Sequence, residues 1–314
     1  LKAVVTRQKS SNDLLKRAEL IRKDSVHGRF KGTIRVDEEQ NALIMNGNVV
    51  KFINADDPSN VDYSKYGIKD ALLIDNTGIA SDEKGLSVHL KNKEIKKVLL
   101  TAPVKGGLKN IVYGVNHDDI QETDKIIGAA SCTTNAIVPV LSAIDTEYTI
   151  DNGHVETVHA YTNDQVLTDV FHSDLRRARS ATQSMIPTKT GAAAAVGLVL
   201  PELDGKLDGF SVRVPTINVS LVDLSFIASR KTSVDEINEV VKAASDGPLK
   251  GVLDYNDGPL VSIDFNHNPA SSTYDATMTK VQEGTLVKVC SWYDNEWGFS
   301  NRMLDTTLAL INAE

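Results

Sequence analysis

The first 130 residues alternate short apolar runs with segments of helical periodicity. The apolar runs predict buried strands at residues 1–6, 71–75, 97–101, 111–115 and 125–127. Helical spacing predicts helices at residues 13–22 and 81–90. Such alternation is typical of βαβ units, whose strands form a mostly parallel sheet. The pattern therefore predicts an α/β fold with a Rossmann-type sheet in this part of the chain.

The pattern changes after residue 131, where apolar runs lengthen and their connections suit a mixed, mainly antiparallel sheet. The expected strands lie at residues 155–161, 209–214, 220–228, 260–265 and 285–292. We expect an incomplete dinucleotide-binding domain at residues 1–131 and an α+β catalytic domain at residues 132–296. A final helix at residues 297–314 is expected to pack back on the cofactor domain.

Composition excludes several classes of protein. The 314 residues carry a net charge of −8, which argues against binding to nucleic acid. No stretch approaches the roughly 18 apolar residues of a membrane span. The two cysteines form no CxxC pair or cluster with histidine, so we expect no metal site, no disulfide framework and a cytoplasmic protein.

The glycine-rich phosphate loop of dinucleotide-binding folds, G-x-G-x-x-G, is absent from the sequence. The chain also starts inside an apolar run and without methionine. We therefore expect the first βα unit of the cofactor domain to lie in an upstream segment.

Cys132 lies just before a helical pattern formed by Val138, Leu141 and Ile144. Ser131 is a suitable N-cap for that helix. Cys132 would then face the unpaired N–H groups at the positive end of the helix, which lower a thiol pKa and favour the nucleophilic thiolate. Taken alone, the same pattern also fits a small buried cysteine in a strand-to-helix turn.

His159 ends a strand of alternating pattern and shares one face with Val155 and Thr157. A histidine at a strand end can act as a general base near neutral pH. A cysteine with a nearby histidine is the usual arrangement for an activated thiolate.

Four motifs occur in a recognisable order: Ser131-Cys132-Thr133-Thr134-Asn135, His159, Arg213-Val214-Pro215-Thr216 and Trp292-Tyr293-Asp294-Asn295-Glu296-Trp297-Gly298. In this order and spacing, the chain resembles the glyceraldehyde-3-phosphate dehydrogenase family from about residue 23 onward. The resemblance implies phosphorylating oxidation of glyceraldehyde 3-phosphate with NAD or NADP through a cysteine thioester, in glycolysis or gluconeogenesis. It also implies a homotetramer.

The resemblance implies a role for each matching residue. Cys132 would be the nucleophile and His159 the base. Arg213 and Thr162 would hold the substrate phosphate, and Asn295 would orient the nicotinamide. The residues implied to receive the attacking inorganic phosphate are Ser131, Thr133, Thr190 and Gly191.

Further cofactor contacts are expected where strands end, because ligands of parallel sheets bind at the carboxyl ends of the strands. Asn76, Thr77 and Gly78 follow one predicted strand, and Thr101 ends another. Arg7 stands near the place where the family usually has an acidic residue on the adenosine ribose. Arg7 would suit a 2′-phosphate, so we predict use of NADP as well as, or instead of, NAD.

Two other functions also fit the sequence. Ile217 gives mild support to an erythrose-4-phosphate dehydrogenase, in which water attacks the thioester, whereas Thr162 favours the phosphorylating enzyme. The second alternative is a catalytically silent fragment with a binding or assembly role, which the missing glycine-rich loop motivates.

Overall fold

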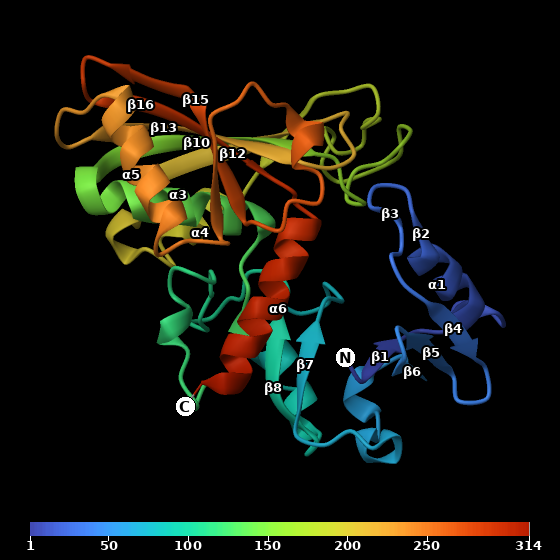
Figure 1. Cartoon of the computed structure of the whole chain (residues 1–314). Coiled ribbons are helices and arrows are strands. Elements are labelled where there is room, and N and C mark those ends of the chain that lie inside the picture. Colours follow the sequence, from blue (N-terminus) through green and yellow to red (C-terminus); the bar gives the residue numbers. More distant parts are fainter. Residues whose placement is uncertain (314) are drawn as a thin grey trace. The chain divides into compact units, whose positions relative to one another are not determined.

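The computed structural model describes residues 1–313 and divides the chain into two compact units, one spanning Leu1–Leu99 and the other beginning at Leu100 (Figure 1). No helix in the described part of the chain is long and apolar enough to cross a membrane.

A four-stranded sheet of order β1-β6-β5-β4 forms the first part of unit one. Its strands are β1 (Ala3–Thr6), β4 (Ile34–Asp37), β5 (Ala42–Met45) and β6 (Asn48–Asn54). β1 pairs in parallel with β6, and the other neighbours pair antiparallel. The helix α1 (Asp13–Arg22) packs on β4 and β5 with Ala18 fully buried, and β2 (Lys23–Asp24) and β3 (Gly28–Arg29) form a small hairpin.

A three-stranded sheet has the order β7-β8-β9, with strands β7 (Ala71–Asp75), β8 (Ile95–Leu100) and β9 (Ile126–Gly128). These strands, together with the parallel β1–β6 pair, confirm the predicted Rossmann-type α/β class. The helix predicted at residues 81–90 is shorter, because α2 (Glu83–Leu86) is capped by Asp82 and gives way to a 3₁₀ turn at His89–Lys91.

The strand predicted at residues 111–115 is wrong. The Asn116 side chain accepts a hydrogen bond from the Val112 N–H at 2.8 Å and donates to the Asn110 carbonyl at 3.0 Å. Gly114 adopts a left-handed φ of 91°. These features turn the backbone where a strand would continue, which apolar patterning alone does not reveal.

Unit two is built on a seven-stranded mixed sheet of order β11-β12-β10-β13-β16-β15-β14. Its strands are β10 (Ile150–Ala160), β11 (Ile186–Lys189), β12 (Leu207–Val214), β13 (Ser220–Ala228), β14 (Leu253–Asn256), β15 (Ser272–Gln282) and β16 (Leu286–Tyr293). Only the β10–β12 and β14–β15 pairs are parallel. The predicted mixed, mainly antiparallel sheet is thereby confirmed.

Three helices cover this sheet: α3 (Cys132–Tyr148), α4 (Ala192–Val196) and α5 (Val234–Asp246) (Figure 1). Their apolar side chains and the inner face of the sheet form one core that includes Ile144 and Phe226. The last helix, α6 (Trp297–Asn312), also contacts α3. The core therefore fixes the start of α3 against the strands that carry the other site residues.

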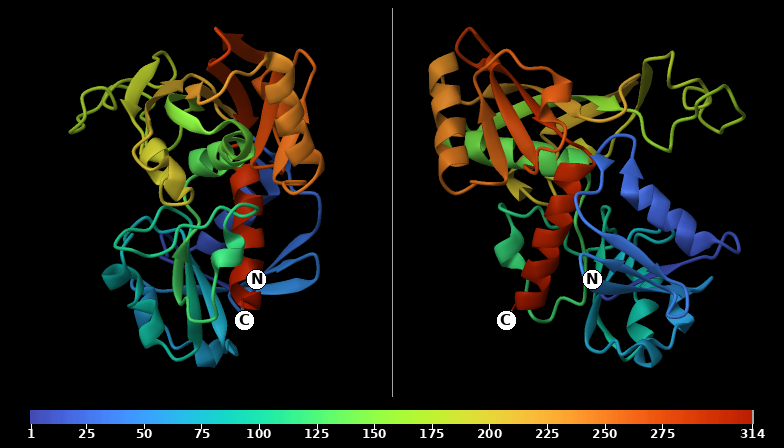
Figure 2. Two further views of the ribbon diagram at one scale, coloured as in Figure 1. Left: turned by 90° about the vertical axis from the view of Figure 1, so that its left-hand side faces the viewer. Right: turned by 45° about the vertical axis from the view of Figure 1, so that its right-hand side comes forward.

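The strand predicted at residues 260–265 is also wrong, because Ser262–Phe265 forms a 3₁₀ turn. Asp264 Oδ2 accepts the Val261 N–H at 2.9 Å, and this local bond favours the turn over a strand. The segment between β10 and β11 is a long loop that projects from one end of the sheet (Figure 2).

Candidate active site

The turn between β9 and α3 holds Cys132 at the first residue of the helix. Ser131 is the N-cap, and its Oγ accepts the Thr134 N–H at 3.0 Å. Asn135 Nδ2 clamps the turn by donating to the carbonyls of Ala129 at 2.8 Å and Ser131 at 2.9 Å. The sulfur is thus presented at the N-terminal end of a 17-residue helix, where backbone N–H groups lack helical partners.

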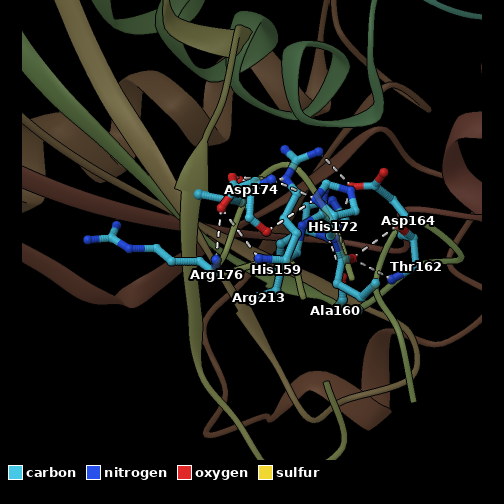
Figure 3. A network of polar contacts seen from close by, with 11 residues as sticks. His159, Ala160, Thr162, Asp164, His172, Asp174, Arg176 and Arg213 are labelled. Atoms are coloured by element: carbon cyan, nitrogen blue, oxygen red, sulfur yellow. Dashed lines mark hydrogen bonds and ion pairs between the residues drawn. The ribbon is translucent and has the colours of Figure 1, made fainter. Parts of the chain in front are cut away.

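His159 and Arg213 lie directly opposite each other on the parallel strands β10 and β12. His159 Nε2 is 3.7 Å from Cys132 Sγ. On the other side of the ring, Arg213 Nη1 lies 2.8 Å from His159 Nδ1 (Figure 3). The structure therefore brings together the three residues that the sequence places far apart: a thiol, an imidazole and a guanidinium.

Burial decides the charge state of the thiol and the imidazole. It raises the pKa of Cys132, while hydrogen bonds from Thr133 and the charge of Arg213 oppose that rise. Cys132 keeps part of its surface exposed, which moderates the effect. Burial, followed by the charge of Arg213, lowers the pKa of His159 from 6.5 to about 4. The imidazole is therefore neutral near pH 7 and able to accept a proton.

The two neighbours of His159 Nδ1 favour opposite tautomers. The Ala160 carbonyl, at 2.6 Å, requires Nδ1 to donate, whereas Arg213 Nη1 can only donate to it. Arg213 Nη1 also donates to that carbonyl at 3.0 Å. Only the tautomer with the proton on Nδ1 leaves a lone pair on Nε2 facing the sulfur.

Thr162 follows β10 and is held by Gln165, whose Oε1 accepts the Thr162 N–H at 3.0 Å and its hydroxyl at 3.3 Å. Asp164 connects this group to the loop, because Arg177 Nη1 donates to its carboxylate at 2.8 Å. Arg177 Nε donates in turn to Thr188 Oγ1 on β11 at 3.0 Å. Thr162 therefore lies in a polar network beside His159 and Arg213 (Figure 3).

The other residues expected to bind phosphate differ in their surroundings. Thr133 is buried, and its hydroxyl lies 2.9 Å from the Tyr293 hydroxyl. Thr190 and Gly191 connect β11 to α4, which packs on α3, and Thr190 Oγ1 accepts the Ala192 N–H at 3.2 Å. Ser131 uses its Oγ as the cap of α3.

The side-chain amide of Asn295 is oriented by Ser220. Ser220 Oγ accepts the Ala160 N–H at 3.0 Å, so its own proton is directed to Asn295 Oδ1 at 2.9 Å. The amide oxygen of Asn295 is committed to this bond, and the Nδ2 amino group remains as a donor for a nicotinamide carbonyl.

The expected cofactor residues of unit one also occupy strand ends. Asn76, Thr77 and Gly78 follow β7, and Asp75 Oδ1 accepts the Thr77 N–H at 2.8 Å. Gly78 has a φ of 71°, and an added Cβ would meet no atom within 4 Å, so the backbone is open to a ligand. Arg7 follows β1, is exposed and donates to the Asp56 carbonyl at 3.4 Å. Thr101 follows β8 in unit two.

Sequence reasoning missed three side chains of this site: Gln165, Arg177 and Tyr293. The sequence contains a signal for Tyr293, because this residue lies in the motif that also contains Asn295. Gln165 and Arg177 lie in a long polar loop, where no local pattern separates a structural contact from a solvated side chain. In the described part of the chain, no group of three or more His, Cys, Asp or Glu side chains is arranged to hold a metal ion.

An α/β unit of dinucleotide-binding type, joined to a thiol–imidazole site, is the combination expected of an NAD-dependent oxidoreductase acting on an aldehyde group. Comparison with protein families agrees. The model of the glyceraldehyde 3-phosphate dehydrogenase NAD binding domain matches residues 2–83, and the model of the C-terminal domain matches residues 131–295. The chain belongs to the glyceraldehyde-3-phosphate dehydrogenase family.

Similar proteins of known name carry the same description. A plasmid-encoded glyceraldehyde-3-phosphate dehydrogenase of Cupriavidus necator is 58% identical over 299 residues, which cover 94% of this chain and 87% of the relative. The enzyme of Xanthobacter flavus is 50% identical, with 93% and 86% covered. Glyceraldehyde-3-phosphate dehydrogenase 1 of Bacillus cereus is 45% identical, with 92% and 85% covered.

Proposed function

We propose that this chain oxidises glyceraldehyde 3-phosphate, with NAD or NADP as the hydride acceptor, to a thioester on Cys132, and that inorganic phosphate cleaves the thioester to give 1,3-bisphosphoglycerate. The observation that carries the proposal is the joint placement of Cys132, His159 and Arg213 within direct contact distance. A thiol, a neutral base and a fixed guanidinium supply a nucleophile, a proton acceptor and an anchor for a phosphorylated aldehyde.

Each residue has a defined task in this reaction. Cys132 Sγ bonds to the aldehyde carbon to form a hemithioacetal, and His159 Nε2 takes the hydroxyl proton of that hemithioacetal as its carbon loses hydride. The Cys132 N–H stabilises the developing oxyanion. Bound NAD or NADP supplies the hydride acceptor. Inorganic phosphate then attacks the thioester carbon, the carbon–sulfur bond breaks, and the sulfur of Cys132 is regenerated.

Arg213 has the features of an anion anchor. Its Nε is buried and has no hydrogen-bond partner in the described part of the chain. A buried N–H without a partner carries a desolvation cost that an anion can remove. A guanidinium also matches the geometry of a phosphate with two parallel N–H bonds. Arg213 would therefore bind the substrate phosphate together with Thr162, while Ser131, Thr133, Thr190 and Gly191 receive the attacking phosphate.

The two domains would divide these tasks. Residues 1–131 would bind the cofactor and residues 132–296 the substrate. The family matches at residues 2–83 and 131–295 support this division.

Phosphate dependence tests the reaction and separates it from the alternatives. We expect NADH production from glyceraldehyde 3-phosphate to require inorganic phosphate and to be lost in Cys132→Ser. Phosphate-independent turnover of erythrose 4-phosphate would favour the hydrolytic alternative instead. No turnover of either aldehyde, with a correctly folded protein, would favour the silent binding role.

The preference between NAD and NADP is a separate proposal. Arg7 is exposed at the end of β1, where a positive charge would suit a ribose 2′-phosphate. We expect measurable turnover with NADP and a loss of NADP use, relative to NAD, in Arg7→Asp. Strict NAD preference in the wild-type protein would reject the role of Arg7.

We also propose a homotetramer in the cytoplasm. The loop between β10 and β11 exposes large apolar side chains, including Phe171 at 96% and Leu175 at 80%, and association would cover them. Both cysteines are free, which suits a reducing compartment.

A further inference from the structure

Tyr293, the last residue of β16, connects three elements of the site. Its hydroxyl lies 2.9 Å from Thr133 Oγ1 on α3 and 2.9 Å from Thr157 Oγ1 on β10. Its ring meets the imidazole of His159 edge-on, with centroids 5.9 Å apart and planes at 79°. Tyr293 is 2% exposed, so these contacts are shielded from solvent.

The three hydroxyl groups form a chain that ends at Thr133, the residue that follows Cys132 in the sequence. Each hydroxyl has one proton to donate and lone pairs to accept. If Thr157 donates to Tyr293 and Tyr293 donates to Thr133, the Thr133 proton is left for the neighbouring Cys132. Hydrogen bonding from the Thr133 side chain lowers the pKa of the Cys132 thiol. Burial keeps Tyr293 itself neutral by raising its pKa.

We propose that Tyr293 is a positioning residue of the reaction, whose hydroxyl orients Thr133 as a donor to the Cys132 sulfur and whose ring holds His159 in place. This inference rests on the proposed function, because it assigns a task only if Cys132 is the nucleophile. Hydrogen bonds in a buried chain strengthen one another, so loss of the middle hydroxyl affects the sulfur although Tyr293 does not touch the substrate.

A purely structural role would also account for a buried tyrosine, because a buried hydroxyl requires partners. The two roles differ in what they do to Cys132. A structural role predicts lower stability and unchanged thiol titration. A positioning role predicts that the thiolate is less favoured without the Tyr293 hydroxyl.

The test is the pH dependence of Cys132 alkylation by iodoacetamide in the purified protein without cofactor, with the modified peptide identified by mass spectrometry. In Tyr293→Phe we expect the apparent pKa of Cys132 to rise by about one unit and the rate near pH 7 to fall roughly tenfold, as the loss of one hydrogen bond implies. Cys290 does not interfere, because it is 1% exposed and burial raises its pKa to about 11.

Tyr274→Phe is the matched control. Tyr274 is fully buried, and its hydroxyl is bonded to Thr279 and Asn238, which are not residues of the site. We expect this variant to lower the thermal midpoint while leaving the Cys132 profile at the wild-type position. A Tyr293→Phe profile that coincides with that of Tyr274→Phe would overturn the inference.

Variants of Thr133 keep the inference testable if Tyr293→Phe does not fold. Thr133→Val removes the hydroxyl donor and should shift the pH profile of Cys132 alkylation. Thr133→Ser keeps the hydroxyl and should leave that profile at the wild-type position. Equal profiles in the two variants would overturn the inference. Failure of the proposed function would be recognised in the wild-type protein, whose Cys132 would not react with glyceraldehyde 3-phosphate. That result would overturn both the proposed function and this inference.

Discussion

At the scale of single residues, His159 is the buried titratable group that connects the thiol to the guanidinium. It is 3% exposed and lies between a thiol and a guanidinium. The fold holds it neutral through burial and through the charge of Arg213. Since a base must be unprotonated to act, the same environment that lowers the pKa of His159 prepares it for proton transfer.

Neutral burial of His159 predicts a pH dependence of stability. Its pKa is about 4 in the folded protein and 6.5 in a model peptide, so the unfolded chain takes up the proton first. The part of the unfolding free energy that depends on neutral His159 is fully present above pH 6.5 and is lost as the pH falls toward 4. Between about pH 7 and about pH 4.5, wild-type should lose about 2 kcal/mol more unfolding free energy than His159→Gln. Urea unfolding of both proteins at the two pH values measures this difference. Equal losses of unfolding free energy in wild-type and His159→Gln would contradict the prediction.

Arg213 predicts a substrate-dependent effect. Arg213→Lys keeps the charge but loses the planar fork, so we expect kcat/KM for glyceraldehyde 3-phosphate to fall by roughly tenfold to a hundredfold. Unphosphorylated glyceraldehyde is the matched control, because it offers no anion to the guanidinium. An equal loss with both aldehydes would show that Arg213 does not act through the phosphate.

At the scale of elements, the start of α3 determines where the sulfur lies. The Ser131 cap was predictable from sequence, because a hydroxyl residue precedes a helical pattern, and the structure confirms it. Ala130, just before the cap, is fully buried with a left-handed φ of 55°. Such a conformation is costly for alanine and persists only where the surrounding structure imposes it.

Two N-cap serines allow a comparison between stability and reactivity. Ser131 caps α3, and Ser233 caps α5 by accepting the Glu236 N–H at 3.3 Å. Each serine-to-alanine variant should cost about 1 kcal/mol of unfolding free energy. Only Ser131→Ala should also slow alkylation of Cys132, because it disturbs the helix start that holds the sulfur. Equal alkylation rates in both variants would argue against control by the α3 terminus.

Strands were predictable where the apolar pattern and the length of the run are both typical of a strand, as in β13 and β7. The errors occurred where a side chain forms a hydrogen bond with the nearby backbone. Asn116 turns residues 111–115 away from strand geometry, and Asp264 does the same near residue 261. Neither of these side-chain hydrogen bonds can be predicted from the periodicity of apolar residues. For the site, Cys132, His159 and Arg213 were predictable from motif order. Tyr293 lies in the same motif as Asn295, but its role follows only from the contacts of its hydroxyl with Thr133 on α3 and Thr157 on β10.

At the scale of the whole molecule, each unit has its own chemistry. Unit one offers strand ends with open backbone at Gly78, and unit two holds the thiol, imidazole and guanidinium. No single-sequence pattern determines subunit number, because association depends on surfaces assembled from distant segments. The exposed apolar side chains of the loop after β10 are the feature that favours assembly.

The tetramer has a direct test in the mass of the protein in solution. We expect light scattering to give four chains per particle, and Phe171→Asp with Leu175→Asp to shift the population toward smaller species. The same double variant should keep its far-ultraviolet circular dichroism spectrum, because both side chains are exposed and remote from the core. A monomeric wild-type protein would reject the proposed assembly.

The central claim is that Cys132 forms the covalent intermediate, and acyl-enzyme trapping tests it most directly. The purified protein is mixed with NAD and glyceraldehyde 3-phosphate without inorganic phosphate, quenched in acid, digested and examined by mass spectrometry. We predict a 3-phosphoglyceryl thioester on the Cys132 peptide, one NADH per modified chain, and loss of the adduct when phosphate is added before quenching. NADH formation with Cys132 unmodified, or with the acyl group on another residue, would contradict the account.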